Sequence, residues 1–127
     1  MKSKTVICAV VLAGLGLAAP ASAHHSYAMF DQTRDLVLTG TVQEWQWANP
    51  HILLVVVAPD DKGKAVPWTL EGSSPAVLRE RGWRRAIVKI GDRVTVHLAP
   101  LKDGSKGGQL NIVTAPDGKT YDMIIKP

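Results

Sequence analysis

Short apolar segments with strand-like alternation, separated by glycine and proline turns and interrupted by one helix signal, constrain this chain more than any other feature. The clearest alternation runs from Arg93 to Leu98, where Val94, Val96 and Leu98 share one phase and the residues between them are polar. Such a strand places its apolar face on a core and its polar face in solvent. The pattern therefore predicts a β protein rather than a helical bundle.

The other expected strands differ in length and character. The first covers residues 36–47, where the apolar phase slips between Val42 and Trp45, and the interior Gly40 favours a bulge or a sharp bend. Asn49-Pro50 ends this strand, and an almost unbroken aliphatic run predicts a buried strand next. The remaining strand segments, each bounded by turn residues, are 51–58, 65–71, 109–115 and 120–125.

Residues 74–82 carry the only good helix signal. Ser74 can cap the helix, Pro75 suits its first position and Gly82 can end it after about two turns. Three strands, a short helix and two or three more strands is the order of an OB-type barrel. We therefore predict an all-β fold with one short helix, a small OB-like Greek-key barrel of five to six strands. A small open sandwich or a different six-stranded barrel fits the same strand count.

The first 23 residues have the form of a secretory signal peptide. Lys2 and Lys4 precede a short apolar run broken by glycines, and Ala21-Ser22-Ala23 fits the small-x-small pattern that signal peptidase accepts. We expect cleavage of residues 1–23 and a single small β-barrel domain over 24–127. This domain would be periplasmic or secreted, with no membrane span in the mature chain.

Charge and cysteine content narrow the function classes. The chain has 15 Lys and Arg against 11 Asp and Glu, but two lysines lie in the predicted leader, so the mature chain would carry a net charge of only +2. We therefore expect no nucleic-acid partner. The one cysteine, Cys8, also lies in the leader, which excludes a disulfide or a cysteine-ligated metal site in the mature domain.

The histidines support a metal-binding hypothesis. Cleavage after Ala23 would leave His24 at the terminus, where its α-amine and imidazole form a chelate for copper or a related divalent ion. A third nitrogen from His25, His51 or His97 would complete the T-shaped arrangement called a histidine brace. We favour His51, because it directly follows the Asn49-Pro50 turn, and place His97 second. Alternatively, the terminal histidines form a polar tail and the others hydrogen-bond at strand ends.

Processing could alter this ligand set. Cleavage one or two residues earlier would place His24 or His25 third from the terminus. A histidine in the third position binds Cu(II) through the amine, the intervening amides and the imidazole. Copper binding would survive such processing, with a different geometry.

A second set of residues favours an organic or macromolecular ligand. Trp45 and Trp47 share a strand face and can stack a sugar or a base on a barrel surface, with core burial as the alternative. Glu71 ends an apolar strand and can orient a histidine or form a simple salt bridge. A basic cluster at and after the helix can bind an anion or form a solvated face. Its residues are Arg79, Arg81, Arg84, Arg85 and Lys89.

Several short motifs together resemble an exported bacterial family of domains of unknown function. Two of them are His24-His25-Ser26-Tyr27 and Trp47-Ala48-Asn49-Pro50-His51. The others are Phe30-Asp31, Gly40-Thr41-Val42, Trp68, Glu71, Ser74-Pro75, Gly82-Trp83 and Gly91-Asp92. The resemblance covers nearly all of the mature chain and implies a small exported domain. It implies no activity and no catalytic residues.

Two functional hypotheses follow. The first is a periplasmic module that carries or senses copper through His24 and its partner histidines. The second is a metal-free cell-envelope module that binds a glycan, peptide or protein through Trp45, Trp47, Glu71, Arg84 and Arg85. An enzyme ranks below both, because a copper oxidase would need a substrate surface that so short a chain offers little material to build.

Overall fold

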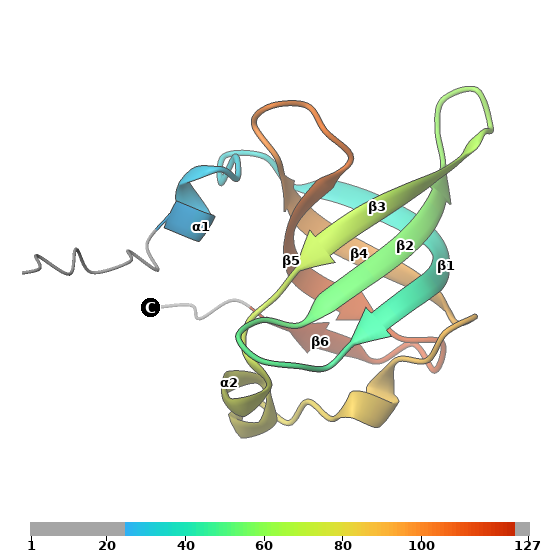
Figure 1. Cartoon of the computed structure of the whole chain (residues 1–127). Coiled ribbons are helices and arrows are strands. Elements are labelled where there is room, and N and C mark those ends of the chain that lie inside the picture. The colour runs from blue at the N-terminus through green and yellow to red at the C-terminus, as the bar shows by residue number, and fades with distance from the viewer. Residues whose placement is uncertain (1–24, 124–127) are drawn as a thin grey trace, which may run out of the picture.

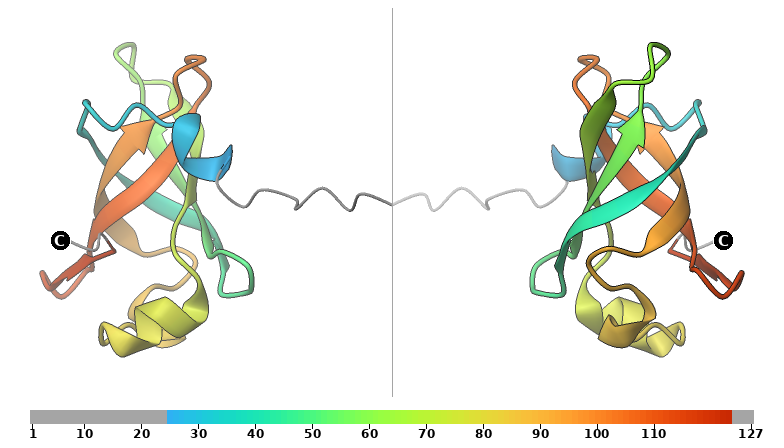
Figure 2. Two further views of the ribbon diagram at one scale, coloured as in Figure 1. Left: turned by 90° about the vertical axis from the view of Figure 1, so that its left-hand side faces the viewer. Right: turned by 90° about the vertical axis from the view of Figure 1, so that its right-hand side faces the viewer.

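The computed structural model describes residues 25–123, which form a closed five-stranded barrel with one additional strand (Figure 1). The strands are β1 (Leu36–Gln46), β2 (Leu53–Pro59), β3 (Ala65–Glu71), β4 (Arg93–Pro100), β5 (Gly107–Thr114) and β6 (Thr120–Asp122). The helical segments are α1 (His25–Ala28), α2 (Pro75–Glu80) and the 3-10 turn η1 (Arg85–Ile87). Figure 2 shows α1 at one side of the barrel, and α2 across one end.

The strand order confirms the predicted OB-like Greek-key barrel. Neighbouring strands run β3-β2-β1-β4-β5-β6 and pair antiparallel, while a parallel pairing of β3 with β5 closes the sheet. The helix α2 falls between β3 and β4, as the OB order requires. Because β5 also pairs with β3, the first strand in this order, five strands close into a barrel, and the alternative of an open sandwich is wrong.

The long first strand bends as predicted, although its bulge lies beyond the glycine. The β1–β2 register shifts between Val42 and Glu44, after which Trp45 continues in the opposite phase. Gly40 has a separate role, because a Cβ there would collide with the Val57 carbonyl oxygen of β2. The glycine therefore permits close strand approach, and the extra residue of the bulge follows it.

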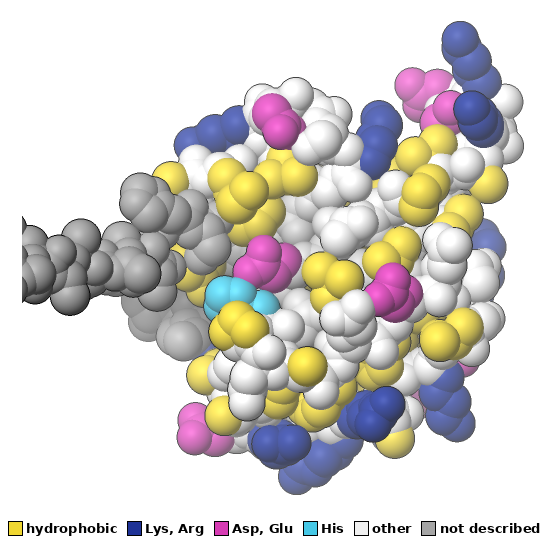
Figure 3. Space-filling model, in the orientation of Figure 1, with side chains coloured by type: hydrophobic (Ala, Val, Ile, Leu, Met, Phe, Trp, Pro, Cys, Tyr) yellow, Lys and Arg dark blue, Asp and Glu magenta, His cyan; other side chains and the backbone are white. Residues whose placement is uncertain are grey.

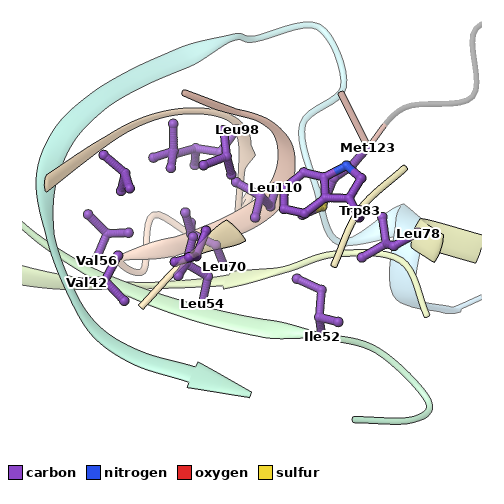
Figure 4. Close-up of a cluster of buried hydrophobic side chains, with 14 residues drawn as sticks. Val42, Ile52, Leu54, Val56, Leu70, Leu78, Trp83, Leu98, Leu110 and Met123 are labelled. Carbon is purple, nitrogen blue, oxygen red and sulfur yellow. The ribbon is translucent and has the colours of Figure 1, made fainter. Parts of the chain in front are cut away.

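The barrel interior is aliphatic and one of its ends is closed by α2 and the segment after it. Val94, Val96 and Leu98 of β4 are buried, as their alternation predicts. Ser74 caps α2 by accepting a hydrogen bond from the Val77 amide at 3.4 Å. The helix places Leu78 in the core, and Trp83 follows it there, so this end is filled with apolar side chains (Figure 4).

The segment before β1 is an ordered arm. We expected no regular element over residues 24–35, whereas a single helical turn forms at α1. The Asp31 amide donates to the Pro100 carbonyl at 2.8 Å, and the Lys102 amide donates to the Met29 carbonyl at 3.0 Å. Phe30 is buried between them and bridges to Leu101. The arm is therefore held against the loop that joins β4 and β5.

Some expectations concern residues outside the described range. The predicted signal peptide, its cleavage site and His24 lie there, as do the last residues of the strand expected over 120–125. Within residues 25–123, no helix is long and apolar enough to cross a membrane.

Candidate functional site

His51 and Glu71 form a histidine–carboxylate pair at the edge of the barrel. His51 lies two residues before β2, and Glu71 is the last residue of β3. The antiparallel register places Glu71 opposite Leu53, which brings its carboxylate to the start of β2. The Nδ1 of His51 lies 2.5 Å from Oε1 of Glu71, and the two side chains are 39% and 35% exposed. On the face drawn in Figure 3, a histidine lies against an acidic side chain where these strands meet.

This pairing determines which histidine nitrogen is available to a ligand. A carboxylate at Nδ1 stabilises the tautomer that carries its proton there, and on this basis we assign Nδ1–H as the donor. Nε2 then carries the free lone pair. Histidines that bind metals commonly donate their other ring N–H to a carboxylate in this way. Glu71 therefore lies against a histidine, the kind of partner considered for it from the sequence.

The pair lines a small pocket together with the N-terminal arm. Tyr27 of α1 and Gln109 of β5 face the same pocket, and Gln109 is the register partner of Glu71 in the parallel pairing. Gln32 of the arm donates to the Gln109 side chain at 2.6 Å, which ties the arm to the pocket wall. The lining residues are Tyr27, Phe30, His51, Glu71, Gly72, Ser73, Gln109, Leu110 and Met123.

Hydrogen bonds within the arm also favour the charged form of one of its carboxyl groups. Hydrogen bonds from the Thr33 hydroxyl and the Thr33 amide lower the pKa of the Asp31 carboxyl from its ordinary value. Asp31 therefore stays anionic at neutral pH and holds a tight turn after Phe30. The turn helps to fix the direction in which the arm enters β1.

Three polar residues of the pocket were not identified as site residues from the sequence. Tyr27 belongs to the arm, Ser73 precedes the cap of α2, and Gln109 is a half-buried residue of β5. Their convergence depends on closure of the barrel by β3 and β5. Only a correct prediction of that parallel register would have found Gln109, because nothing in its neighbourhood is chemically distinctive.

His97 forms a second histidine–carboxylate pair elsewhere. It lies on β4, and its Nδ1 is 2.8 Å from Oδ2 of Asp35, with side-chain exposures of 32% and 58%. It does not line the pocket that contains His51. The side chain of His25, like all of His24, lies outside the described residues. Among the residues that the structure describes, no group of three or more His, Cys, Asp or Glu side chains could hold a metal ion.

The predicted stacking surface is engaged by the protein itself. The rings of Trp45 and Trp47 have centroids 5.6 Å apart and are inclined by 54°, so they present no common plane. The Trp45 indole N–H donates to the Arg85 carbonyl at 2.9 Å. The guanidinium of Arg79 lies 5.9 Å from the Trp47 ring centroid, within the range of a cation–π contact.

The residues predicted to bind an organic ligand are divided between two places. Glu71 lies with His51, whereas Arg85 lines a shallow groove beside Trp45. Arg84 donates to the backbone carbonyls of Arg79 and Trp83 at 3.1 Å and 2.7 Å. Its guanidinium therefore helps to hold the segment after α2, while Arg85 remains at the surface.

Together, the fold and the pocket define a small OB-type β-barrel domain with an N-terminal arm and a surface histidine–carboxylate pair. The chain belongs to DUF6152, a family of unknown function, whose family model matches residues 12–111. This match includes the arm and the barrel as far as the middle of β5. No curated protein and no solved structure matches the chain. The function must therefore be inferred from the residues of this chain.

Proposed function

We propose that the processed chain is a periplasmic or secreted module that binds Cu(II). The ligands are the α-amine and imidazole of His24 together with Nε2 of His51. The observation that carries this proposal is the Nδ1–Oε1 contact between His51 and Glu71, which leaves Nε2 as the free nitrogen in a pocket that the N-terminal arm also lines. Neutral nitrogen ligands of this kind suit Cu(II) in a tetragonal field.

Chain length supports participation of the terminus. His24 precedes Tyr27 by three residues, and Tyr27 lines the pocket that contains His51. Three residues of extended chain span at most about 11 Å. The terminal chelate can therefore reach only positions within about that distance of Tyr27. Hydrogen bonds hold residues 29–32 against the loop after β4 and the Gln109 side chain, which supports a ligand role for the terminus near His51.

The same geometry favours His51 over His97 as the third ligand. Both imidazoles have a carboxylate at Nδ1, so their intrinsic suitability as ligands is similar. Only His51 shares a pocket with a residue of α1. Position relative to the arm therefore distinguishes the two.

The metal-free alternative is a module that binds a glycan, a peptide or another envelope protein on the barrel face. Its predicted stacking surface, Trp45 and Trp47, already uses an indole N–H and a ring face within the chain. Sugar stacking requires an accessible, unobstructed ring face. This requirement makes the copper proposal the better account of the site.

The proposal is tested on protein exported with its own leader. Intact-mass analysis should give a chain that starts at His24, and titration against a competing chelator should give one Cu(II) per chain. His51→Ala should weaken binding, because it removes one ligand, whereas His97→Ala should bind copper like the native protein. Retention of residues 1–23 in the soluble protein, or equal losses in the two variants, would count against the proposed site.

A further inference from the structure

The turn between η1 and β4 exposes an isoleucine side chain to solvent. Ile90 is 72% exposed, more than the other exposed large apolar residues that the structure describes. It lies in a tight turn in which the Asp92 amide donates to the Lys89 carbonyl at 3.1 Å, with Gly91 in the left-handed region at φ +91°. A single exposed apolar side chain is common on protein surfaces, so what surrounds Ile90 decides whether it belongs to a binding surface.

This turn is fixed rather than loose. The Gly91 amide donates to the Val42 carbonyl at 2.8 Å, and the Val42 amide donates to the Asp92 carbonyl at 2.8 Å. The Asp92 carboxylate also accepts a hydrogen bond from the Lys89 amide at 2.9 Å. The protein therefore holds the backbone of Ile90 in a defined position, so that little backbone conformational entropy is lost when the residue enters a lipid surface.

The surroundings of Ile90 are apolar at the centre and basic at the rim. Trp45 and Ala86 lie beside it, and the side chains of Arg85 and Lys89 extend from the same segment. We call this the Ile90 surface; it consists of Trp45, Arg85, Ala86, Val88, Lys89 and Ile90. A partly exposed tryptophan beside basic side chains is typical of protein surfaces that lie at the level of lipid headgroups.

Positive charge is concentrated in the segment of the chain that carries Ile90. Residues 25–123 contain twelve Lys and Arg and eleven Asp and Glu, yet six of those basic residues and only two of the acidic ones fall between Arg79 and Arg93. One of the two acids, Asp92, is bonded into the turn. Lys and Arg side chains gather along the lower edge of the face in Figure 3, over α2 and the segment that follows it.

We propose that the Ile90 surface docks the protein onto an anionic phospholipid bilayer. Ile90 enters the boundary between headgroups and acyl chains, the indole of Trp45 lies at the headgroup level, and Arg85 and Lys89 contact lipid phosphates. The groove that these residues line is shallow, and the apolar side chain exposed at its edge suits a deformable surface, whereas an acidic peptide would need a deeper groove to bury its own side chains. The basic rim complements the negative lipid surface. This proposal is independent of copper binding at His51.

Vesicle flotation of the exported protein tests it. Vesicles of mixed phosphatidylglycerol and phosphatidylcholine should bind the protein, vesicles of phosphatidylcholine alone should not, and added salt should release it. Ile90→Ser should weaken partitioning about tenfold, through lost transfer of its side chain. Arg85→Gln and Lys89→Gln should each weaken it about fivefold, the effect expected for one basic residue at an anionic membrane surface.

Matched variants separate docking from general surface effects. Val37→Ser removes an apolar side chain that is 49% exposed on β1, and Lys62→Gln and Lys64→Gln remove charges from the β2–β3 turn. These controls should bind like the native protein, and circular dichroism should show that every variant is folded. Equal binding to neutral vesicles, or equal losses in Ile90→Ser and Val37→Ser, would overturn the proposal. Binding to soluble polyglutamate without binding to vesicles would identify an acidic protein partner instead.

Discussion

The carboxylate of Glu71 is expected to strengthen copper binding through His51, and Glu71→Gln tests this with little structural change. Glutamine keeps a side-chain oxygen that accepts the Nδ1–H of His51, but it removes the negative charge. The imidazole should therefore keep its orientation and become a weaker donor at Nε2. Asp35→Asn makes the same chemical change beside His97 and serves as the matched control.

The size of the effect follows from the geometry and exposure of the pair. A separation of 2.5 Å between Nδ1 and Oε1 places the carboxylate in direct contact with the imidazole. The side chains are 39% and 35% exposed, however, so solvent screens part of the interaction. Loss of a residue that supports a metal ligand costs about 10–100-fold in metal affinity. Because this pair is partly exposed, we expect Glu71→Gln to weaken copper affinity about tenfold, or by about 1.4 kcal/mol.

The measurement is a competition titration with a chromophoric Cu(II) chelator on native, Glu71→Gln and Asp35→Asn proteins that share the same verified terminus. Only Glu71→Gln should shift the dissociation constant, and its unfolding transition should match that of the native protein. An unchanged affinity in Glu71→Gln, or an equal loss in Asp35→Asn, would show that the contact with His51 does not act on a metal.

Two further predictions concern the barrel. Gly40→Ala should destabilise the domain by about 1–3 kcal/mol, since its Cβ meets the Val57 carbonyl oxygen within paired strands. Gly63→Ala, where a Cβ meets nothing within 4 Å, should cost only the left-handed backbone conformation, about 1 kcal/mol, and urea denaturation in which Gly63→Ala is the less stable variant would contradict this. Val96→Asp should abolish the cooperative thermal transition by placing an unpaired carboxylate at a fully buried position. A native-like transition in Val96→Asp would refute its place in the core.

Local patterns predicted the elements that depend on neighbouring residues. The alternation of Val94, Val96 and Leu98 identified the buried face of β4, and Ser74 with Pro75 located the start of α2. Both signals arise within a few residues, because strand facing and helix capping are properties of adjacent positions. The order of these elements was then sufficient to predict the OB-like barrel.

Features that depend on distant residues were not predictable in the same way. Glu71 meets His51 through the β2–β3 register, and Gln109 reaches them only because β3 pairs with β5. The two paired carboxylates also differ: Glu71 was considered as a partner for a histidine, whereas Asp35 was not singled out. Trp83 is fully buried at the closed end of the barrel, a position that its basic neighbours in the sequence conceal.

The most direct test of the proposed copper site compares two forms that differ only before His24. The native form begins at His24, and the second carries Gly-Ser-Gly-Ser before it, which turns the α-amine of His24 into an amide. A four-residue extension is needed because one or two added residues would place a histidine third from the terminus and create another chelate. Competition titration should give one tightly bound Cu(II) in the native form and much weaker binding in the extended form. Equal affinities would contradict the proposed terminal site and favour the metal-free envelope module.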